Sequence, residues 1–99
     1  MIVYEVNLEV DDAVLAEYRA WLEVHMREIL ALPGFVSAEL FEHVDAAPAA
    51  RRGLCAQYRL LSEQDLERYL RDDAPRLRAD GERRFGGRFS ASRRVLRCT

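Results

Sequence analysis

The sequence has 99 residues, of which 49% are hydrophobic and 32% charged, a size and composition typical of one small globular domain. Five glycines and three prolines are too few for a disordered or collagen-like chain. No apolar run approaches the roughly 20 residues of a membrane span, and the opening residues, MIVYE, lack the basic and apolar blocks of a secretory signal. We therefore expect a single domain over residues 1–99, located in the cytoplasm.

Charge is unevenly distributed along the chain, although the formal net charge is only −2. Residues 1–45 carry ten acidic and two basic side chains, residues 46–75 carry five of each, and residues 76–99 carry eight basic and two acidic ones. All fifteen basic residues are arginines. An acidic front and a basic tail leave three interpretations open: ion pairing within the fold, pairing between subunits, or nucleic-acid binding.

The first half of the chain predicts a strand, a helix and a second strand. Residues 2–10 alternate apolar and polar types, as in a half-buried strand. The aspartates at 11–12 can cap a helix whose apolar residues recur at helical spacing over 14–30 and which Pro33-Gly34 ends. Residues 35–44 alternate again, with one side formed by Val36, Ala38, Leu40 and Val44.

The second half predicts a loop, a strand, a helix and a last strand. The alanine-rich segment 46–50 reads as a surface loop, and residues 54–60 alternate as a third strand. Ser62 opens a capping motif for a second helix, which Pro75 must kink or restart. Residues 89–98 form the last strand, where the adjacent Arg93 and Arg94 indicate a bulge or a sheet edge.

The order β-α-β-β-α-β predicts an α+β, ferredoxin-like fold: a four-stranded antiparallel sheet with two helices on one face. The apolar sides of the strands must lie under the helices, which leaves the other face bare. By alternation this open face carries Val3, Glu5, Asn7, Glu9, Ser37, Glu39, Phe41, His43, Cys55, Gln57 and Arg59. Such a face is wetted by solvent, paired with a second copy, or used on a ligand.

If two subunits close face to face, the open-face residues line the interior of a barrel. A purely structural lining and a small-molecule site both remain open, since ligand pockets need only a few convergent polar groups. The residues that can supply a base, a positioned donor or an oxyanion partner there are Glu5, Asn7, Glu39, His43, Gln57 and Arg59. Neither their types nor their spacing specifies a reaction.

Several sequence features resemble a known family. They are residues 1–6 (MIVYEV), Trp21 four residues before His25, residues 74–78 (APRLR) and residues 84–89 (RFGGRF). Together they look like a family of uncharacterised small bacterial proteins, a domain of unknown function in the dimeric α+β barrel superfamily. That superfamily includes antibiotic-biosynthesis monooxygenases, haem-degrading monooxygenases and muconolactone isomerases. The resemblance spans nearly the whole chain and implies a homodimer, but no reaction.

Asn7, Trp21 and His25 invite comparison with the haem-degrading branch, where an asparagine, a tryptophan and a histidine act in the pocket. Here Trp21 and His25 share one helix, whereas that branch takes its tryptophan from a strand, so the motif does not transfer. We interpret Trp21 as a core anchor and His25 as a half-buried histidine, with a ligand role for either as the alternative. We predict no cofactor, and no metal because no ligand spacing is present.

The remaining features favour structural explanations. Because the last strand of this fold pairs beside the first, Arg93, Arg94 and Arg97 can lie near Glu5 and Glu9 and explain the uneven charge. Residues 3–8 loosely resemble the first-strand motif of RNA-recognition domains. That motif would place Tyr4 on the open face and Glu5 beneath the helices, which the alternation of this strand opposes. Cys55 and Cys98 read as passive thiols.

Two hypotheses of function follow. In the first, the protein is a binding or interaction module formed by a homodimer that meets through the open sheet faces. In the second, it is a small enzyme or ligand carrier of the monooxygenase-like type, which takes an aromatic or planar molecule. RNA binding is a weaker third alternative.

Overall fold

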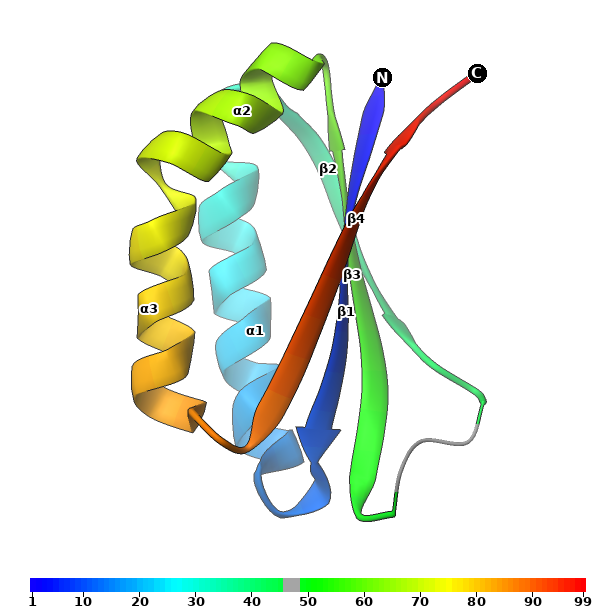
Figure 1. Ribbon diagram of the computed structural model, residues 1–99, viewed down its shortest axis with the longest axis vertical. Helices are drawn as coiled ribbons and strands as arrows, with labels where there is room; N and C mark the ends of the chain where they lie inside the picture. The colour runs from blue at the N-terminus through cyan, green and yellow to red at the C-terminus, as the bar shows by residue number, and fades with distance from the viewer. Residues whose placement is uncertain (46–48) are drawn as a thin grey trace.

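The computed structural model describes residues 1–45 and 49–99, which form one sheet with helices packed on one of its faces (Figure 1). The elements in chain order are β1 (Ile2–Asp11), a 3-10 turn (Asp12–Val14), α1 (Leu15–Leu30), β2 (Phe35–Glu42), β3 (Arg51–Leu60), α2 (Glu63–Asp72), α3 (Ala74–Phe85) and β4 (Phe89–Arg97). This order confirms the predicted succession of strands and helices. The predicted loop 46–50 lies partly outside the described residues.

The sheet is antiparallel, with strand order β2-β3-β1-β4. β1 lies next to both β3 and β4, pairing from Ile2 opposite Leu60 to Asp11 opposite Arg51 on one side. On the other side it pairs continuously with β4 from Ile2 to Val10. This is the strand order of the ferredoxin-like fold, so the predicted α+β class is confirmed. In Figure 1, α1, α2 and α3 lie on the same side of the sheet and leave its other face bare.

The core lies between that sheet and the helices, and the alternation of β1 decides which side chains enter it. Four side chains of β1 lie under the helices, each at most 4% exposed: Ile2, Tyr4, Leu8 and Val10. The facing stripe of α1 consists of Tyr18, Leu22, Met26 and Ile29. Aromatic rings make up much of the core, since Tyr4 lies 6.0 Å from both Tyr58 and Tyr69, centroid to centroid.

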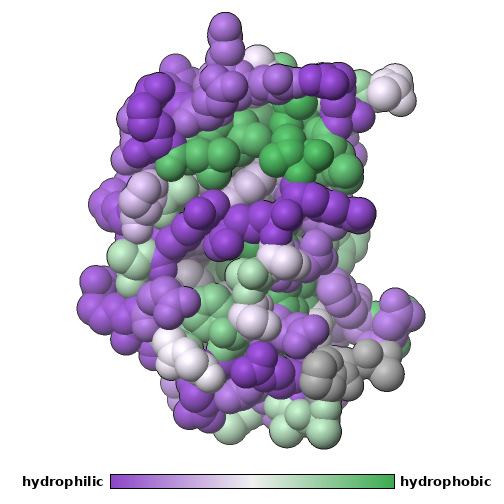
Figure 2. Space-filling model, in the orientation of Figure 1, coloured by the Kyte–Doolittle hydropathy of each residue, from purple (hydrophilic) through white to green (hydrophobic). Residues whose placement is uncertain are grey.

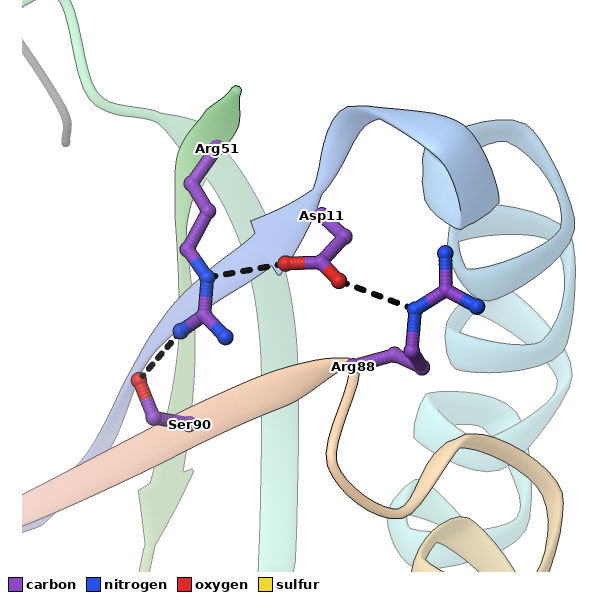
Figure 3. Close-up of polar contacts among 4 residues, drawn as sticks. All are labelled: Asp11, Arg51, Arg88 and Ser90. Atoms are coloured by element: carbon purple, nitrogen blue, oxygen red, sulfur yellow. Dashed lines mark hydrogen bonds and ion pairs between the residues drawn. The ribbon is translucent and has the colours of Figure 1, made fainter. Parts of the chain in front are cut away.

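The start of α1 differs from the prediction. Neither Asp11 nor Asp12 caps the helix through its side chain, and a 3-10 turn precedes Leu15. The reason is that Asp11 is otherwise engaged: Arg51 Nε donates to its Oδ1 at 2.8 Å and Arg88 Nε to its Oδ2 at 2.9 Å (Figure 3). Arg51 also reaches Ser90 Oγ at 3.4 Å. This cluster fastens the end of β1 to β3 and to the start of β4.

The predicted inward side of the second strand is wrong at two positions. Val36 is 46% exposed and Val44, beyond the end of β2, is 98% exposed. A bulge between Phe35 and Ser37 shifts the alternation, because one extra residue moves the side chains before it to the other face. Phe35 therefore packs under the helices, with its ring centroid 5.2 Å from that of Tyr69.

The second half of the chain confirms two local predictions. Ser62 caps α2 by accepting a hydrogen bond from the Asp65 backbone N–H at 3.2 Å. The helix ends at Asp72 and restarts as α3 with Pro75 in its first turn, which tolerates the missing donor. β4 lies at a sheet edge, and its register with β1 is continuous, so Arg93 and Arg94 point to opposite faces. Of the two alternatives for these arginines, the edge is confirmed.

Candidate functional site

The first candidate site is a polar network on the open face of the sheet, centred on Glu5. Glu5 lies directly opposite Gln57 on β3 and Arg94 on β4. Its Oε1 accepts from Asn7 Nδ2 at 2.9 Å and from Arg94 Nε at 2.8 Å, while its Oε2 accepts from Gln57 Nε2 at 2.9 Å. His43 extends the network, with its Nε2 3.2 Å from Asn7 Oδ1. The structure thus brings together four of the six candidate ligand-binding residues that the sequence predicts on the open face.

The charge state of Glu5 follows from these partners. The residue is only 4% exposed, yet hydrogen bonds from Asn7 and Arg94 lower the pKa of its carboxyl below the ordinary value of 4.5. Burial acts in the opposite direction and is outweighed. Glu5 is therefore an ionised carboxylate at neutral pH, covered by the groups that bind it.

The position of His43 depends on a glycine. A Cβ built on Gly53 would lie 2.6 Å from His43 Nδ1, so only glycine leaves room for the imidazole at this point of β3. A backbone hydrogen bond from His43 N to Gly53 O, 2.8 Å long, fixes the same contact. The space beside Asn7 and His43 is a polar hollow of about 380 Å³, bordered also by Glu9, Ser90 and Ser92.

The two remaining candidate ligand-binding residues, Glu39 and Arg59, lie apart from this network. Glu39 is exposed on β2, opposite Gln57, and forms no hydrogen bond with another side chain among the described residues. Arg59 is exposed near the C-terminal end of β3, where its Nη1 lies 3.7 Å from Cys98 Sγ. Cys55 is buried on the same face, and burial raises the pKa of its thiol, which opposes nucleophilic reactivity.

The second candidate site is a cavity of about 280 Å³ on the opposite side of the sheet, under the helices. The side chains and backbone of α1, α3, β1 and β4 form most of its wall. Aromatic side chains form part of the lining, among them Tyr4, Tyr18, Trp21, Tyr58 and Phe89. Three charged side chains, Arg78, Glu82 and Arg93, and the imidazole of His25 line the same cavity.

Trp21 and His25 are one helical turn apart on α1, which explains why they meet in the cavity. Their rings stack at a centroid distance of 4.6 Å and an interplanar angle of 24°. Trp21 Nε1 donates to Asp80 Oδ2 at 2.9 Å, and its Cη2 lies 2.9 Å from where a Cβ on Gly81 would stand. The ring is half-buried: it packs against the core and lines the cavity as well.

The imidazole of His25 is uncharged at neutral pH. Burial lowers its pKa below the ordinary 6.5; nearby Glu28 and Asp80 act against this shift, and Arg93 reinforces it. Among the described residues its ring forms no hydrogen bond with another side chain, and the residue lines the cavity. It is the one histidine that the structure places at this cavity.

The sequence alone does not reveal this cavity. Tyr4 reads as a core residue by alternation, and its phenol oxygen accepts a hydrogen bond from Arg78 Nη2 at 2.9 Å. The two residues are 74 positions apart, and nothing in their local spacing connects them. The sequence gives only a partial indication of the cavity: the spacing of four residues between Trp21 and His25 places both on one face of the helix.

No group of three or more metal-ligating side chains occurs in residues 1–45 and 49–99. Across the same residues, no helix is both long and apolar enough to pass through a bilayer.

The strand order, with the helices packed on one face of the sheet, places this domain in the ferredoxin-like α+β fold class. A family model described as a domain of unknown function (DUF4286) matches residues 1–99, and the chain belongs to that family. This confirms the resemblance found in the sequence. Comparison with curated proteins finds no match.

Solved structures agree on the fold at low sequence identity. The chain is similar to SnoaB, a cofactor-independent oxygenase from Streptomyces nogalater (16% identity, TM-score 0.68, covering 98% of this chain and 92% of that one). It is also similar to the heme-degrader MhuD from Mycobacterium tuberculosis, solved with two hemes bound in its active site (15% identity, TM-score 0.67, covering 99% of this chain and 95% of that one). A de novo designed protein, Foldit4, has a similar structure as well (10% identity, TM-score 0.64, covering 99% of this chain and 98% of that one). Because a designed chain shares the architecture, the fold by itself assigns no activity.

Proposed function

We propose that this protein is a homodimer that binds a small, planar molecule in the cavity under the helices of each protomer. The observation that carries the proposal is the aromatic lining of that cavity, together with its volume of about 280 Å³. Cavities of this kind, largely apolar with a few convergent polar groups, are the usual binding sites for small molecules.

The volume indicates the size of the ligand. An apolar cavity of roughly 150 Å³ in another protein holds one benzene ring. The present cavity is about twice as large, which suits two fused rings. Flat aromatic walls favour a flat ligand, because offset and edge-to-face ring contacts contribute roughly 0.5–1.5 kcal/mol each beyond burial.

Haem does not fit this site. The cavity volume of about 280 Å³ is at the lower limit of sites for drug-sized molecules and is too small for a tetrapyrrole. We therefore expect the protein to be purified without haem.

The open face of the sheet supports the dimer. Phe41 and Leu96 are apolar side chains on this face, 43% and 39% exposed. Val3 on the central strand β1 pairs with Leu96 and adds to this apolar surface. The Glu5 carboxylate already accepts three hydrogen bonds, so a second copy can cover it without leaving a buried charge unpaired. The predicted ligand residues Glu5, Asn7, His43 and Gln57 then belong to the contact between protomers.

A ligand in the open-face hollow is the alternative, since Asn7 and His43 border about 380 Å³ of space there. The RNA-binding alternative has less support, because it needs Tyr4 on the open face and Tyr4 lies under the helices, 3% exposed.

The single tryptophan makes ligand binding directly measurable. Trp21 gives one indole N–H signal in a nitrogen-15 NMR spectrum, and its ring lines the cavity. We expect 2-naphthamide, an uncharged two-ring probe, to shift this signal in a saturable way. Gly81→Leu should abolish the effect, because its side chain would enter the space held by Trp21 Cη2. Ala79→Leu, at an exposed position of the same helix, is the matched control. A titration unchanged by Gly81→Leu would contradict the site.

The dimer is tested separately by native mass spectrometry. Leu96→Arg places a charge on the open face and should give a monomer, whereas Val95→Arg, on the opposite face of β4, should leave the dimer intact. A wild-type monomer, or equal effects of the two variants, would contradict pairing through the open face.

A further inference from the structure

The cavity under the helices carries an excess of positive charge that the rest of the fold does not neutralise. Within residues 1–45 and 49–99, ten of the fifteen arginines form ion pairs with carboxylates. Arg78 and Arg93 both line the cavity, and within the part of the chain that the structure describes neither has a carboxylate within ion-pairing distance. In a protein this rich in ion pairs, two such arginines at one cavity call for an explanation.

The two guanidinium groups come from opposite walls of the cavity. Arg78 belongs to α3, in the helix layer. Arg93 belongs to β4 and pairs with Val6, on the side of the sheet that the helices cover. Figure 2 shows a band of hydrophilic side chains across the side of the molecule on which α3 and β4 face each other, between hydrophobic areas. A ligand between these walls meets apolar surface and positive charge together.

Arg78 is held in place by one hydrogen bond, which leaves its charge and its other N–H donors available. Its Nη2 donates to the Tyr4 phenol oxygen at 2.9 Å, a neutral acceptor that leaves the positive charge uncompensated. A guanidinium has five N–H donors in a planar fork, so the other donors can bind both oxygens of a carboxylate. Tyr4 thus positions the arginine for an anion.

The positive charges of these arginines act on the tyrosine side chains that line the cavity. Burial raises the pKa of Tyr69 to about 12, and the charges of Arg78 and Arg93 both act against that shift. Arg93 acts in the same sense on the buried Tyr18 and Tyr58. One carboxylate, Glu82, also lines the cavity, and His25 is uncharged, which leaves a net charge of one positive.

We propose that the ligand is an aromatic carboxylic acid, with its rings against the aromatic wall that contains Trp21 and its carboxylate bound by Arg78 and attracted by Arg93. This inference rests on the proposed binding function and specifies its ligand class.

The test compares two probes of the same shape, 2-naphthoate and uncharged 2-naphthamide, by titration of the Trp21 indole signal in the full-length protein. We expect the acid to bind about fivefold more tightly, because a partly exposed ion pair contributes up to ~1 kcal/mol. The advantage should shrink as salt is added. Equal affinities would overturn the anionic ligand and leave the cavity function standing, whereas no binding of either probe would overturn both.

Variants locate the source of the preference. Arg78→Gln and Arg93→Gln should each reduce the ratio of the two affinities, and Arg78→Lys, which keeps the charge but not the planar fork, should retain only part of it. Arg19→Gln is the matched control, since Arg19 also lacks an ion pair in the described structure but lines a different groove, beside α1 and β2. The amide, which lacks the charge, should bind all folded variants alike and so reports that the cavity is intact. A ratio that Arg78→Gln and Arg93→Gln leave unchanged would overturn the assignment.

Discussion

Replacing Glu5 by alanine removes the acceptor at the centre of the open-face network and leaves three donors without it. Asn7 and Gln57 are half-buried, and each lost hydrogen bond costs about 1 kcal/mol. Arg94 is 65% exposed, so its ion pair adds only about 0.5–1 kcal/mol. We therefore expect Glu5→Ala to lower the free energy of unfolding by about 3 kcal/mol. For a domain of this size that is a fall of roughly 12–24 °C in Tm.

Urea unfolding followed by circular dichroism measures the effect, at one protein concentration because a dimer makes stability concentration-dependent. Glu39→Ala, an exposed carboxylate on the same face, is the control and should change stability by less than about 0.5 kcal/mol. If the two variants lose the same amount, the network does not stabilise the fold and our reasoning fails.

The pH dependence gives a second check on Glu5. Its pKa is lower in the folded protein than the ordinary 4.5, chiefly through the hydrogen bond from Asn7. A carboxylate with a lowered pKa contributes stability above the unfolded value, and that contribution is lost as the pH falls through the folded value. The stability difference between wild type and Glu5→Ala should therefore be full at neutral pH and should shrink below about pH 4.5. A difference that stays constant into acid would contradict the lowered pKa.

Three further outcomes follow from single contacts. Asp11→Asn removes the charge that two arginines share, at side chains 26–47% exposed, and should lower the midpoint of urea unfolding; an unchanged midpoint would mean that the cluster does not stabilise the fold. Ser62→Ala removes the cap of α2 and should cost about 1 kcal/mol, with Ser62→Thr as the conservative control. Cys98 should react at once with an aromatic disulfide reagent while Cys55, buried and with a raised pKa, reacts only on unfolding; simultaneous labelling of both would contradict its burial.

The fold could be predicted from the sequence because its signals are local. The alternation of β1, the cap at Ser62 and the restart at Pro75 each depend on residues within a few positions of one another, and all three are confirmed. The errors came where a distant partner intervened. Asp11 has the right place for a cap but pairs with Arg88, 77 positions away. The bulge before Ser37 shifts one face of β2 by a residue, which no local pattern indicates.

The candidate sites show the same division. Alternation placed Glu5 and Gln57 on one face, and the strand register then set them opposite each other. The cavity under the helices could not be predicted, because it depends on how closely α3 approaches the sheet. Gly81 lets the ring of Trp21 lie against α3, and Arg78 reaches Tyr4 across the core. These contacts join residues that the sequence treats as separate core positions.

The position of β4 has a consequence for how the protein is made. β1 is bonded along its whole length to the last strand of the domain, with partners 79 residues apart at Val10 and Phe89 and 95 apart at Ile2 and Arg97. At roughly 5–20 residues per second, a ribosome needs several seconds between these strands. During that time one edge of β1 is unpaired and able to join another extended chain. The nascent domain is therefore most vulnerable to aggregation just before its last strand emerges, and truncation within β4 should make that exposure permanent.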